Sequence, residues 1–316
     1  MTKNEKKMII EQDINTLNDV IRLGRYIGNT PLYEVRKLSS NPNVKIFAKL
    51  EWQQFGGSVK SRPAYQIIYK AIEEGELGTG KVLLDASSGN TAIAYASICA
   101  QLGIPVTICL PENASWERKS MLRALGANLE YTSKFGSTDE AQERAVELHK
   151  SDPERYYLAN QYGNDNNWKA HYVHTGNEIW TQTKGQVTHF VAGLGTTGSF
   201  TGITKALKEL NPGISAIALQ PDSAMHGLEG WKDMQTAKIP TIFDQNLPDN
   251  TKYIDTYQAY ETIQLAAIKE GLLLSPSAAA NLTGAMKLAN EIEAGIIVTL
   301  FPDNAEKYSE VMKELF

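Results

Sequence analysis

Strand patterns and helix patterns take turns along most of this chain, and this alternation constrains the fold more than any other feature. The predicted strands lie at 44–50, 81–85, 105–110, 128–131, 156–159, 187–192, 214–219 and 296–300. The predicted helices cover 8–25, 60–74, 91–101, 115–125, 137–149, 170–181, 199–210, 256–269, 278–292 and the residues from 304 on. Such an order is typical of an α/β protein in which helices cover both faces of a parallel sheet.

The composition narrows the classes of function. The 316 residues are enough for two domains, at roughly 150 residues each. The formal net charge is -5, so the chain offers no basic field for nucleic acid or for an anionic membrane surface. Cys99 and Cys109 lie in apolar runs and the histidines are scattered, so we expect neither a disulfide framework nor a metal site.

The N-terminal residues are charged, with no apolar signal core after them, and no run reaches the ~18 apolar residues of a membrane span. We therefore expect a cytoplasmic protein without membrane association. Within 8–25, apolar side chains recur at loose helical spacing at Ile10, Ile14, Leu17 and Ile21. This helix needs a surface to pack against, either its own domain or a second copy of the chain.

A glycine-rich turn at 56–64 delivers Lys60 to the start of a predicted helix. Pro63 suits the first turn of a helix, because its missing N–H would have no partner there. Lys60 would then lie at the positive end of a helix dipole, where a partly desolvated lysine can serve as an amine nucleophile. A phosphate-binding turn or a surface lysine would explain the same residues.

A second glycine-rich turn, Gly193–Gly198, follows a predicted strand and opens a predicted helix. Backbone N–H groups at such a helix start bind phosphate, and the hydroxyl groups of Thr196, Thr197 and Ser199 suit a terminal phosphate dianion. The pattern also matches a dinucleotide fingerprint, although Gln220 stands where a ribose-binding acid is expected, with Asp222 nearby. A purely structural turn is the remaining interpretation.

Two further helix starts carry hydroxyl and amide groups, the turn at 87–91 and the segment around Ser277. The turn at 87–91 could bind a carboxylate at its helix-start N–H groups. Because serine, threonine and asparagine are the preferred capping residues, an ordinary helix cap is the more economical interpretation of that turn alone. Capping explains Ser277 equally well.

Several motifs occur together and in order. They are Gly28-Asn-Thr-Pro-Leu32, Gly57-Ser-Val-Lys-Ser-Arg62, Ser88-Gly-Asn-Thr91, Leu110-Pro-Glu-Asn113, Gln161-Tyr-Gly-Asn164, Thr175-Gly176, Gly193-Leu-Gly-Thr-Thr-Gly198 and Pro302-Asp303. Together they resemble the cysteine synthase family, fold type II enzymes that use pyridoxal 5'-phosphate (PLP), over about residues 20–310. The glycine turn with two threonines resembles the cysteine synthase B branch.

The resemblance implies an architecture. The family has the PLP fold type II, similar to the tryptophan synthase β subunit, with two doubly wound α/β domains and the cofactor in the cleft between them. Carried onto this chain, it implies a smaller mobile domain at 54–163 and a larger domain at 1–53 and 164–316. It also implies a homodimer.

The resemblance also assigns roles to residues. Lys60 would form the Schiff base with PLP and then move the proton at the substrate α-carbon. Asn90 would bind the pyridine 3'-oxygen, and Ser277 the ring nitrogen, where a neutral hydroxyl favours β-elimination over transamination. The phosphate would be held by Gly195, Thr196, Thr197, Gly198 and Ser199. The substrate carboxylate would be held by Ser87, Ser88, Gly89, Thr91 and Gln161.

The implied reaction is a β-replacement. O-acetyl-L-serine would lose acetate to give a bound aminoacrylate, and sulfide or another thiol would add to give L-cysteine or an analogue. Alternatives within the class are cystathionine β-synthase-like, lanthionine-forming and cysteine desulfhydrase activities. An NAD-dependent oxidoreductase built on Gly193–Gly198 and a non-catalytic protein that keeps the fold are the alternatives from other classes.

The chain departs from the family pattern at several positions. Ser61 stands where the family has aspartate, and Asn304 follows Pro302-Asp303 where the family has serine. In the region that faces the substrate side chain in the family, this chain has Gly227, Glu229 and Trp231. These three residues would shape a pocket for the leaving group or the nucleophile, unless they are solvent-facing loop residues.

Overall fold

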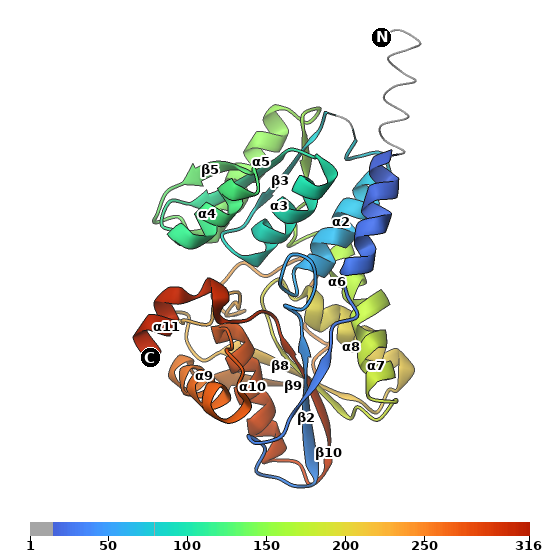
Figure 1. Cartoon of the computed structure of the whole chain (residues 1–316), viewed down its shortest axis with the longest axis vertical. Helices are drawn as coiled ribbons and strands as arrows, with labels where there is room; N and C mark the ends of the chain where they lie inside the picture. Colours follow the sequence, from blue (N-terminus) through green and yellow to red (C-terminus); the bar gives the residue numbers. More distant parts are fainter. Residues whose placement is uncertain (1–14, 79) are drawn as a thin grey trace. The chain divides into compact units, whose positions relative to one another are not determined.

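The computed structural model describes residues 15–78 and 80–316, and contacts divide them into two compact units. Unit 1 contains residues 15–28 and Lys60–Asn167, and unit 2 contains Asn29–Val59 and Trp168–Phe316. The expected division places 15–28 and 164–167 in the larger domain and 54–59 in the smaller one, whereas the contacts place 15–28 and 164–167 in unit 1 and 54–59 in unit 2. The helical residues 15–23 lie beside α2 (Figure 1), and Gly24 packs against Tyr65 of α2. The mobility expected of the smaller domain stays a prediction.

Unit 2 is built on a six-stranded sheet in the order β1-β2-β10-β7-β8-β9. The strands are β1 (Leu32–Val35), β2 (Val44–Leu50), β7 (His189–Gly193), β8 (Ser215–Pro221), β9 (Asn250–Ile254) and β10 (Gly295–Phe301). All neighbours are parallel except β1 and β2, which are antiparallel because a short connection reverses the chain between them. The predicted parallel sheet therefore carries one antiparallel strand, β1, at this edge.

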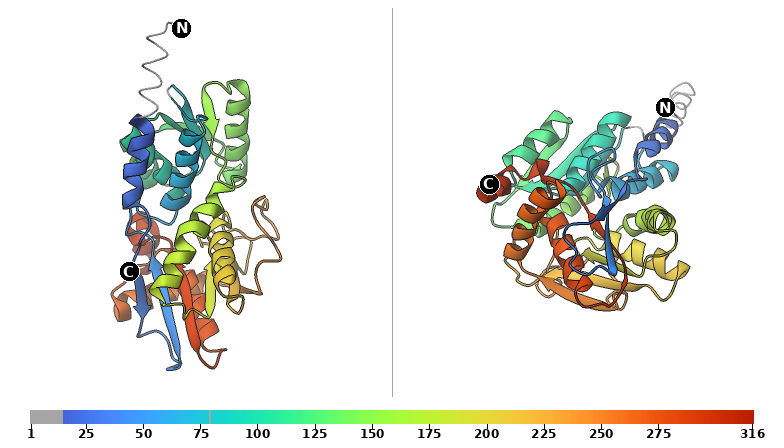
Figure 2. Two further views of the ribbon diagram at one scale, coloured as in Figure 1. Left: turned by 90° about the vertical axis from the view of Figure 1, so that its right-hand side faces the viewer. Right: turned by 60° about the horizontal axis from the view of Figure 1, so that its bottom comes forward.

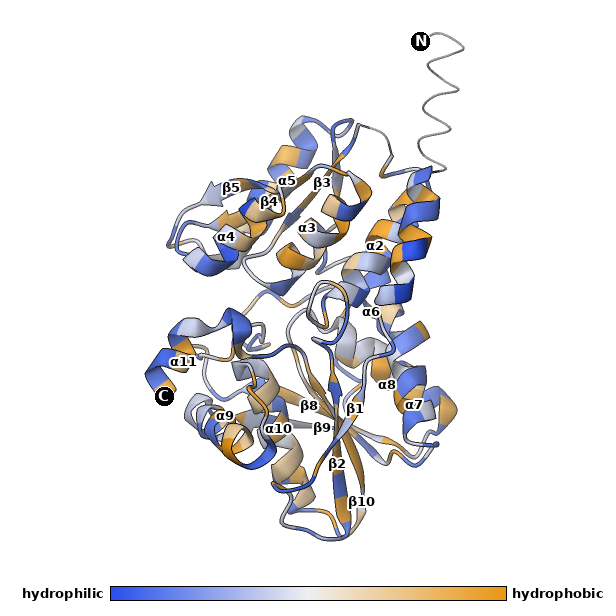
Figure 3. Ribbon diagram, in the orientation of Figure 1, coloured by the Kyte–Doolittle hydropathy of each residue, from blue (hydrophilic) through white to orange (hydrophobic). Residues whose placement is uncertain are grey.

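Helices cover both faces of this sheet, as the alternation of strands and helices predicts. Phe190 of β7 belongs to a buried cluster with Ile203 of α8 (Gly198–Leu210), whereas its neighbour Val191 clusters with Ile263 of α9 (Thr256–Glu270). Figures 1 and 2 show α9 and α10 (Pro276–Ala289) on one face and α7 (Gly176–Gln182) and α8 on the other. Figure 3 colours much of β8 and β10 as hydrophobic, as expected of strands buried on both sides.

The remaining elements of unit 2 refine the predicted boundaries. The helix expected at 170–181 consists of α6 (Asn166–Ala170), a π-helical turn at His171–Thr175 and α7. The last helix expected from 304 is a 3₁₀ turn at Ala305–Lys307 followed by α11 (Ser309–Leu315). Strand β9 was not predicted, because its sequence Asn-Thr-Lys-Tyr-Ile has little apolar pattern and ends a polar excursion.

Unit 1 contains a four-stranded parallel sheet in the order β5-β4-β3-β6. The strands are β3 (Val82–Ala86), β4 (Val106–Pro111), β5 (Asn128–Thr132) and β6 (Tyr156–Leu158). The helices are α2 (Ser61–Glu73), α3 (Asn90–Leu102), α4 (Trp116–Ala124) and α5 (Ser137–Ser151). Ala141 and Ala145 of α5 pack on Leu84 and Cys109, and Figure 1 shows α3 on the opposite side of the sheet. The predicted α/β class is confirmed.

The predicted N-terminal helix is present over residues 15–23, whereas Ile10 and Ile14 lie outside the described residues. Its buried side chains are Val20 and Leu23, whereas Ile21 is 48% exposed within the single chain, so the packing of Ile21 against a second copy stays a prediction. No helix within the described residues is long and apolar enough to cross a membrane.

Candidate active site

Lys60 is the N-cap residue of α2, directly before Ser61, so it lies at a helix start as predicted from the glycine turn and Pro63. Its backbone is already helical, and its carbonyl accepts the first helical hydrogen bond, from the N–H of Ala64 at 3.0 Å. No side chain caps this helix start. The amine of Lys60 is thus carried at the positive end of the α2 dipole, in a partly exposed position.

The chain segment directly before Lys60 is fixed by three hydrogen bonds within unit 2. Donor first, they are Lys307 Nζ to the Gly57 oxygen at 2.9 Å, Gln54 Nε2 to the Ser58 oxygen at 3.2 Å and the Val59 N–H to the Pro302 oxygen at 2.8 Å. Hydrogen bonds therefore fix the backbone of three successive residues, 57–59, directly before Lys60.

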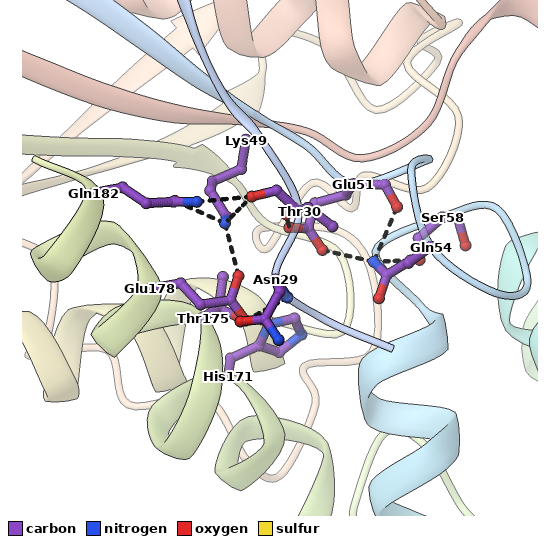
Figure 4. A network of polar contacts seen from close by, with 10 residues as sticks. All are labelled: Asn29, Thr30, Lys49, Glu51, Gln54, Ser58, His171, Thr175, Glu178 and Gln182. Carbon is purple, nitrogen blue, oxygen red and sulfur yellow. Dashed lines mark hydrogen bonds and ion pairs between the residues drawn. The ribbon is translucent and has the colours of Figure 1, made fainter. Parts of the chain in front are cut away.

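A buried polar network extends this support (Figure 4). Lys49 is fully buried, and its Nζ contacts Glu178 at 2.6 Å, Gln182 at 2.9 Å and the Thr30 oxygen at 2.7 Å. Beside it, the buried Glu51 accepts hydrogen bonds from Thr30 Oγ1 at 2.7 Å and from Gln54 Nε2 at 2.9 Å. The network thus joins β2 and α7 to the segment before Lys60.

The turn at 87–91 connects β3 to α3 in unit 1. The N-cap of α3 is Gly89, and no side chain caps the helix. Ser87 Oγ instead accepts a hydrogen bond from the Gly89 N–H at 3.2 Å, and Ser88 and Asn90 are partly exposed. The capping interpretation of this turn is therefore wrong, and the N–H groups that start α3 have no side-chain cap to compete with an anion.

Gln161 joins this turn, as the resemblance implies. Its Oε1 accepts a hydrogen bond from Thr91 Oγ1 at 2.7 Å, and its Nε2 donates to the Ala86 oxygen at 2.9 Å. Its N–H donates to Asp85 Oδ2 at 3.1 Å. Thr91 and Gln161, both buried, thus form one connected polar group with the end of β3.

The glycine turn at 193–198 joins β7 to α8 in unit 2. Thr197 has a left-handed backbone (φ 69°), which is rare for a β-branched residue, and its buried Oγ1 has no hydrogen-bond partner among residues 15–78 and 80–316. No side chain caps α8. Asn281 of α10 fixes the beginning of the turn by accepting a hydrogen bond from the Gly193 N–H at 2.8 Å. Gly195 and Ser199 are partly exposed, whereas Thr196 and Gly198 are buried.

The segment at 227–231 lies under the glycine turn. Trp231 is buried, and a Cβ added to Gly193 would lie 2.0 Å from its ring. A Cβ on Gly195 would lie 2.0 Å from the Gly230 oxygen, so both glycines are required by close packing. Trp231 therefore has a packing role, and the expectation of a solvent-facing residue is wrong for it. Glu229 is exposed.

Gly227 is tied to α9 by a hydrogen bond from its N–H to Thr256 Oγ1 at 3.1 Å. The role of Gly227, Glu229 and Trp231 in a substrate pocket stays a prediction.

Ser277 is the second residue of α10. The cap of this helix is Ser275, whose Oγ accepts a hydrogen bond from the Ala278 N–H at 3.2 Å. Ser277 Oγ lies 3.3 Å from Ser275 Oγ and is buried. Capping therefore explains Ser275 and leaves Ser277 available for another role.

The family of the chain follows from comparison with known proteins. A model of the family described as pyridoxal-phosphate-dependent enzymes matches residues 23–303. A cysteine synthase of Aquifex aeolicus (strain VF5) is 44% identical over 291 residues, which cover 90% of this chain and 89% of the relative. The chain belongs to the cysteine synthase family of PLP-dependent enzymes. The predicted family and cofactor are confirmed.

Two other members of the cysteine synthase family extend the comparison. Cysteine synthase B of Salmonella typhimurium is 35% identical over 288 residues, which cover 90% of this chain and 93% of the relative. The crystal structure of a cysteine synthase from Entamoeba histolytica matches with a TM-score of 0.87 and 32% identity, covering 93% of this chain and 90% of that one. The predicted fold type II is therefore confirmed.

The residues of this family member fit its cofactor. A phosphate dianion needs several donors at a helix start, and the turn at 195–199 offers backbone N–H groups together with the unpartnered, buried hydroxyl of Thr197. Burial of a free hydroxyl in a strained backbone is costly, and a ligand that accepts its proton removes that cost. Membership in this family favours PLP over the dinucleotide alternative for the same turn.

Sequence reasoning missed several polar residues that support the candidate site. They are Lys49, Glu51, Gln54, Asp85, Glu178 and Lys307. A signal exists for two of them, because Lys49 stands between apolar residues near the end of β2 and Asp85 interrupts the otherwise apolar β3. A charged residue at a buried strand position requires a polar partner.

Proposed function

We propose that this protein is a cysteine synthase that converts O-acetyl-L-serine and sulfide into L-cysteine and acetate. The observation that carries the proposal is the free, buried hydroxyl of Thr197 in the turn that starts α8, in a chain that also presents Lys60 at the start of α2. The cysteine synthase relatives, which align over nearly the whole chain, support it.

PLP supplies an electron sink that stabilises negative charge at the substrate α-carbon. We infer that Lys60 would bind PLP covalently and that Asn90 and Ser277 would hold the PLP ring. Gly195, Thr196, Thr197, Gly198 and Ser199 hold its phosphate. As an uncharged partner, the Ser277 hydroxyl donates or accepts one hydrogen bond without fixing a proton on the ring, which favours elimination at the β-carbon.

The substrate carboxylate is held by the turn that starts α3. The N–H groups of this turn, the hydroxyls of Ser87 and Ser88 and the second Nε2–H of Gln161 would provide donors for two carboxylate oxygens. The Thr91 hydroxyl, which donates to Gln161 Oε1, would orient that amide toward the carboxylate. Gly89 lets the backbone approach the carboxylate closely.

Lys60 acts as the proton carrier. Once its amine is free, it accepts the α-proton, and the acetate group leaves from the β-carbon. Sulfide then forms the new C–S bond at the β-carbon, and Lys60 returns the proton to the α-carbon. Gly227, Glu229 and Trp231 would border the space for the leaving group and the sulfur donor.

We infer further that the protein works in the cytoplasm as a homodimer. The family resemblance supports the dimer, and the two buried, unbridged cysteines are compatible with a reducing compartment. Light scattering at micromolar concentration is expected to give twice the chain mass, and a monomer would contradict the proposal.

A visible absorption spectrum tests the proposed function. The purified protein should be yellow, its band should shift to longer wavelength with O-acetyl-L-serine, and sulfide should restore it while L-cysteine forms. A yellow protein whose spectrum does not change with O-acetyl-L-serine would support PLP as the cofactor but would contradict O-acetyl-L-serine as the substrate. Cystathionine formed from homocysteine, or pyruvate formed without an added thiol, would favour the corresponding alternatives. A protein that binds no PLP would contradict the proposal as a whole.

A further inference from the structure

Asp85 lies at the end of β3, directly before the turn at 87–91, and is 3% exposed. Its Oδ1 accepts a hydrogen bond from the Ala86 N–H at 2.8 Å, and its Oδ2 accepts one from the Gln161 N–H at 3.1 Å. One carboxylate thus connects the end of β3 to the segment that follows β6. Both oxygens are needed as acceptors in this arrangement.

Gln161 is the residue through which Asp85 reaches the turn. Its backbone N–H is held by Asp85, and its backbone oxygen accepts a hydrogen bond from Asn167 Nδ2 at 2.6 Å. Its side chain bridges the Ala86 oxygen and Thr91 Oγ1. A shift of the Gln161 backbone would therefore displace its amide, whose second Nε2–H is the donor left for a carboxylate.

Among the residues that the structure describes, the titratable groups that face Asp85 carry no positive charge. They are Tyr95 of α3, Cys109 of β4, Tyr157 of β6 and Tyr162, and burial raises the pKa of each, to about 12 for Cys109 and Tyr157. Burial likewise raises the pKa of Asp85 to about 6, although the two backbone N–H groups oppose this shift. At neutral pH Asp85 is an ionised, buried carboxylate that faces uncharged groups.

This charge does not serve the stability of the fold. Because the pKa of Asp85 is raised on folding, its contribution to stability is fully present below about pH 4 and is lost as the pH rises through about 6. A neutral side chain of the same shape would avoid that loss. The Asp85 carboxylate, which lowers stability at neutral pH, lies directly before the turn at 87–91, and this placement points to a role in function.

We propose that Asp85 is a positioning residue for the substrate carboxylate, because it holds Gln161 and Thr91 in the geometry that binds it. The inference rests on the proposed function of the turn at 87–91. A protonated carboxyl group has a donor on one oxygen and can no longer accept both N–H groups. Protonation of Asp85 should therefore loosen Gln161 and weaken substrate binding.

Asp85→Asn tests this inference in the holoenzyme. Asparagine has the shape of aspartate, but its NH₂ group cannot accept a hydrogen bond and would face the backbone N–H of either Ala86 or Gln161. At pH 7.5 the KM for O-acetyl-L-serine should rise about 10-fold, because one hydrogen bond to a charged group is lost, while kcat stays within about 2-fold. The melting temperature should change little, because removal of the buried charge offsets the lost hydrogen bond. A merely structural role would lower the melting temperature and leave the KM of the folded fraction unchanged.

The pH dependence of KM provides the second measurement. In the wild-type enzyme, KM should rise as the pH falls from 7.5 to 5.5, whereas in Asp85→Asn it should start high and change little. Asp152→Asn is the matched control, because Asp152 is exposed in the same unit and also accepts a backbone N–H, from Arg155 at 3.1 Å. Its KM should follow that of the wild type. If Asp85→Asn does not fold, the wild-type profile decides, and a KM constant from pH 7.5 to 5.5 would overturn the inference.

Thr91→Val separates failure of this inference from failure of the proposed function. If Thr91→Val raises KM and Asp85→Asn does not, the turn binds the substrate and Asp85 has no positioning role. If the wild-type enzyme does not turn over O-acetyl-L-serine, or if Thr91→Val leaves KM unchanged, the proposed carboxylate site itself is wrong.

Discussion

Lys60→Ala is expected to lower kcat by at least about 10³-fold, because the chain then lacks both the amine that binds the cofactor and the base that moves the α-proton. After borohydride reduction of the wild-type holoenzyme, mass spectrometry should locate the cofactor on the peptide that contains Lys60. The variant should carry none. Its melting temperature without cofactor should stay close to that of the wild type, since Lys60 is partly exposed at a helix start.

Lys134→Ala is the matched control, because Lys134 is an exposed lysine of the same unit. It should retain both the covalent cofactor and the activity. Turnover by Lys60→Ala, or cofactor attached to another lysine, would contradict the assignment. The phosphate-binding or surface interpretation of Lys60 would then be the better one.

Lys49→Met is expected to lower the free energy of unfolding by about 3–5 kcal/mol, because it leaves Glu178 without its cationic partner. Lys49 is fully buried, and the Glu178 side chain is only 11% exposed. Figure 4 shows that both side chains belong to the network that reaches the segment before Lys60. Urea unfolding of the wild type and the variant measures the difference.

Two companion variants separate the ion pair from the packing. Lys45→Met changes an exposed lysine on the same strand and should cost less than about 0.5 kcal/mol. Lys49→Met combined with Glu178→Gln removes both charges and should recover part of the loss. A cost below about 1 kcal/mol for Lys49→Met alone would show that the network contributes little to stability.

The alternation of strands and helices, and the turns between them, could be predicted from local pattern. Apolar runs bounded by turn residues identify buried strands, and the glycine turn with Pro63 locates the start of α2. Strand β9 and the antiparallel pairing of β1 could not be predicted in this way. Both depend on hydrogen bonds to a neighbouring strand that is distant in sequence or reversed in direction, and β9 in addition has little local apolar pattern.

In the candidate site, too, some features could be predicted from local sequence and others depend on tertiary contacts. Glycine and hydroxyl residues between a strand and a helix mark the turns at 87–91 and 193–198, and the joint order of the motifs identifies the family. The sequence cannot tell which serine caps a helix, because Ser275 and Ser277 are both suitable and the difference lies in the backbone angles. It also cannot show that Trp231 lies beneath Gly193.

The sequence by itself determined the fold class, the cofactor family and the position of Lys60 at a helix start, because these depend on periodicity and on residues adjacent in the chain. Only the tertiary structure decided the partners of the buried charges. Lys49 meets Glu178, and Asp85 meets the N–H of Gln161, across 129 and 76 residues of sequence respectively. A buried charge must find a partner, but which residue provides it depends on how the elements pack.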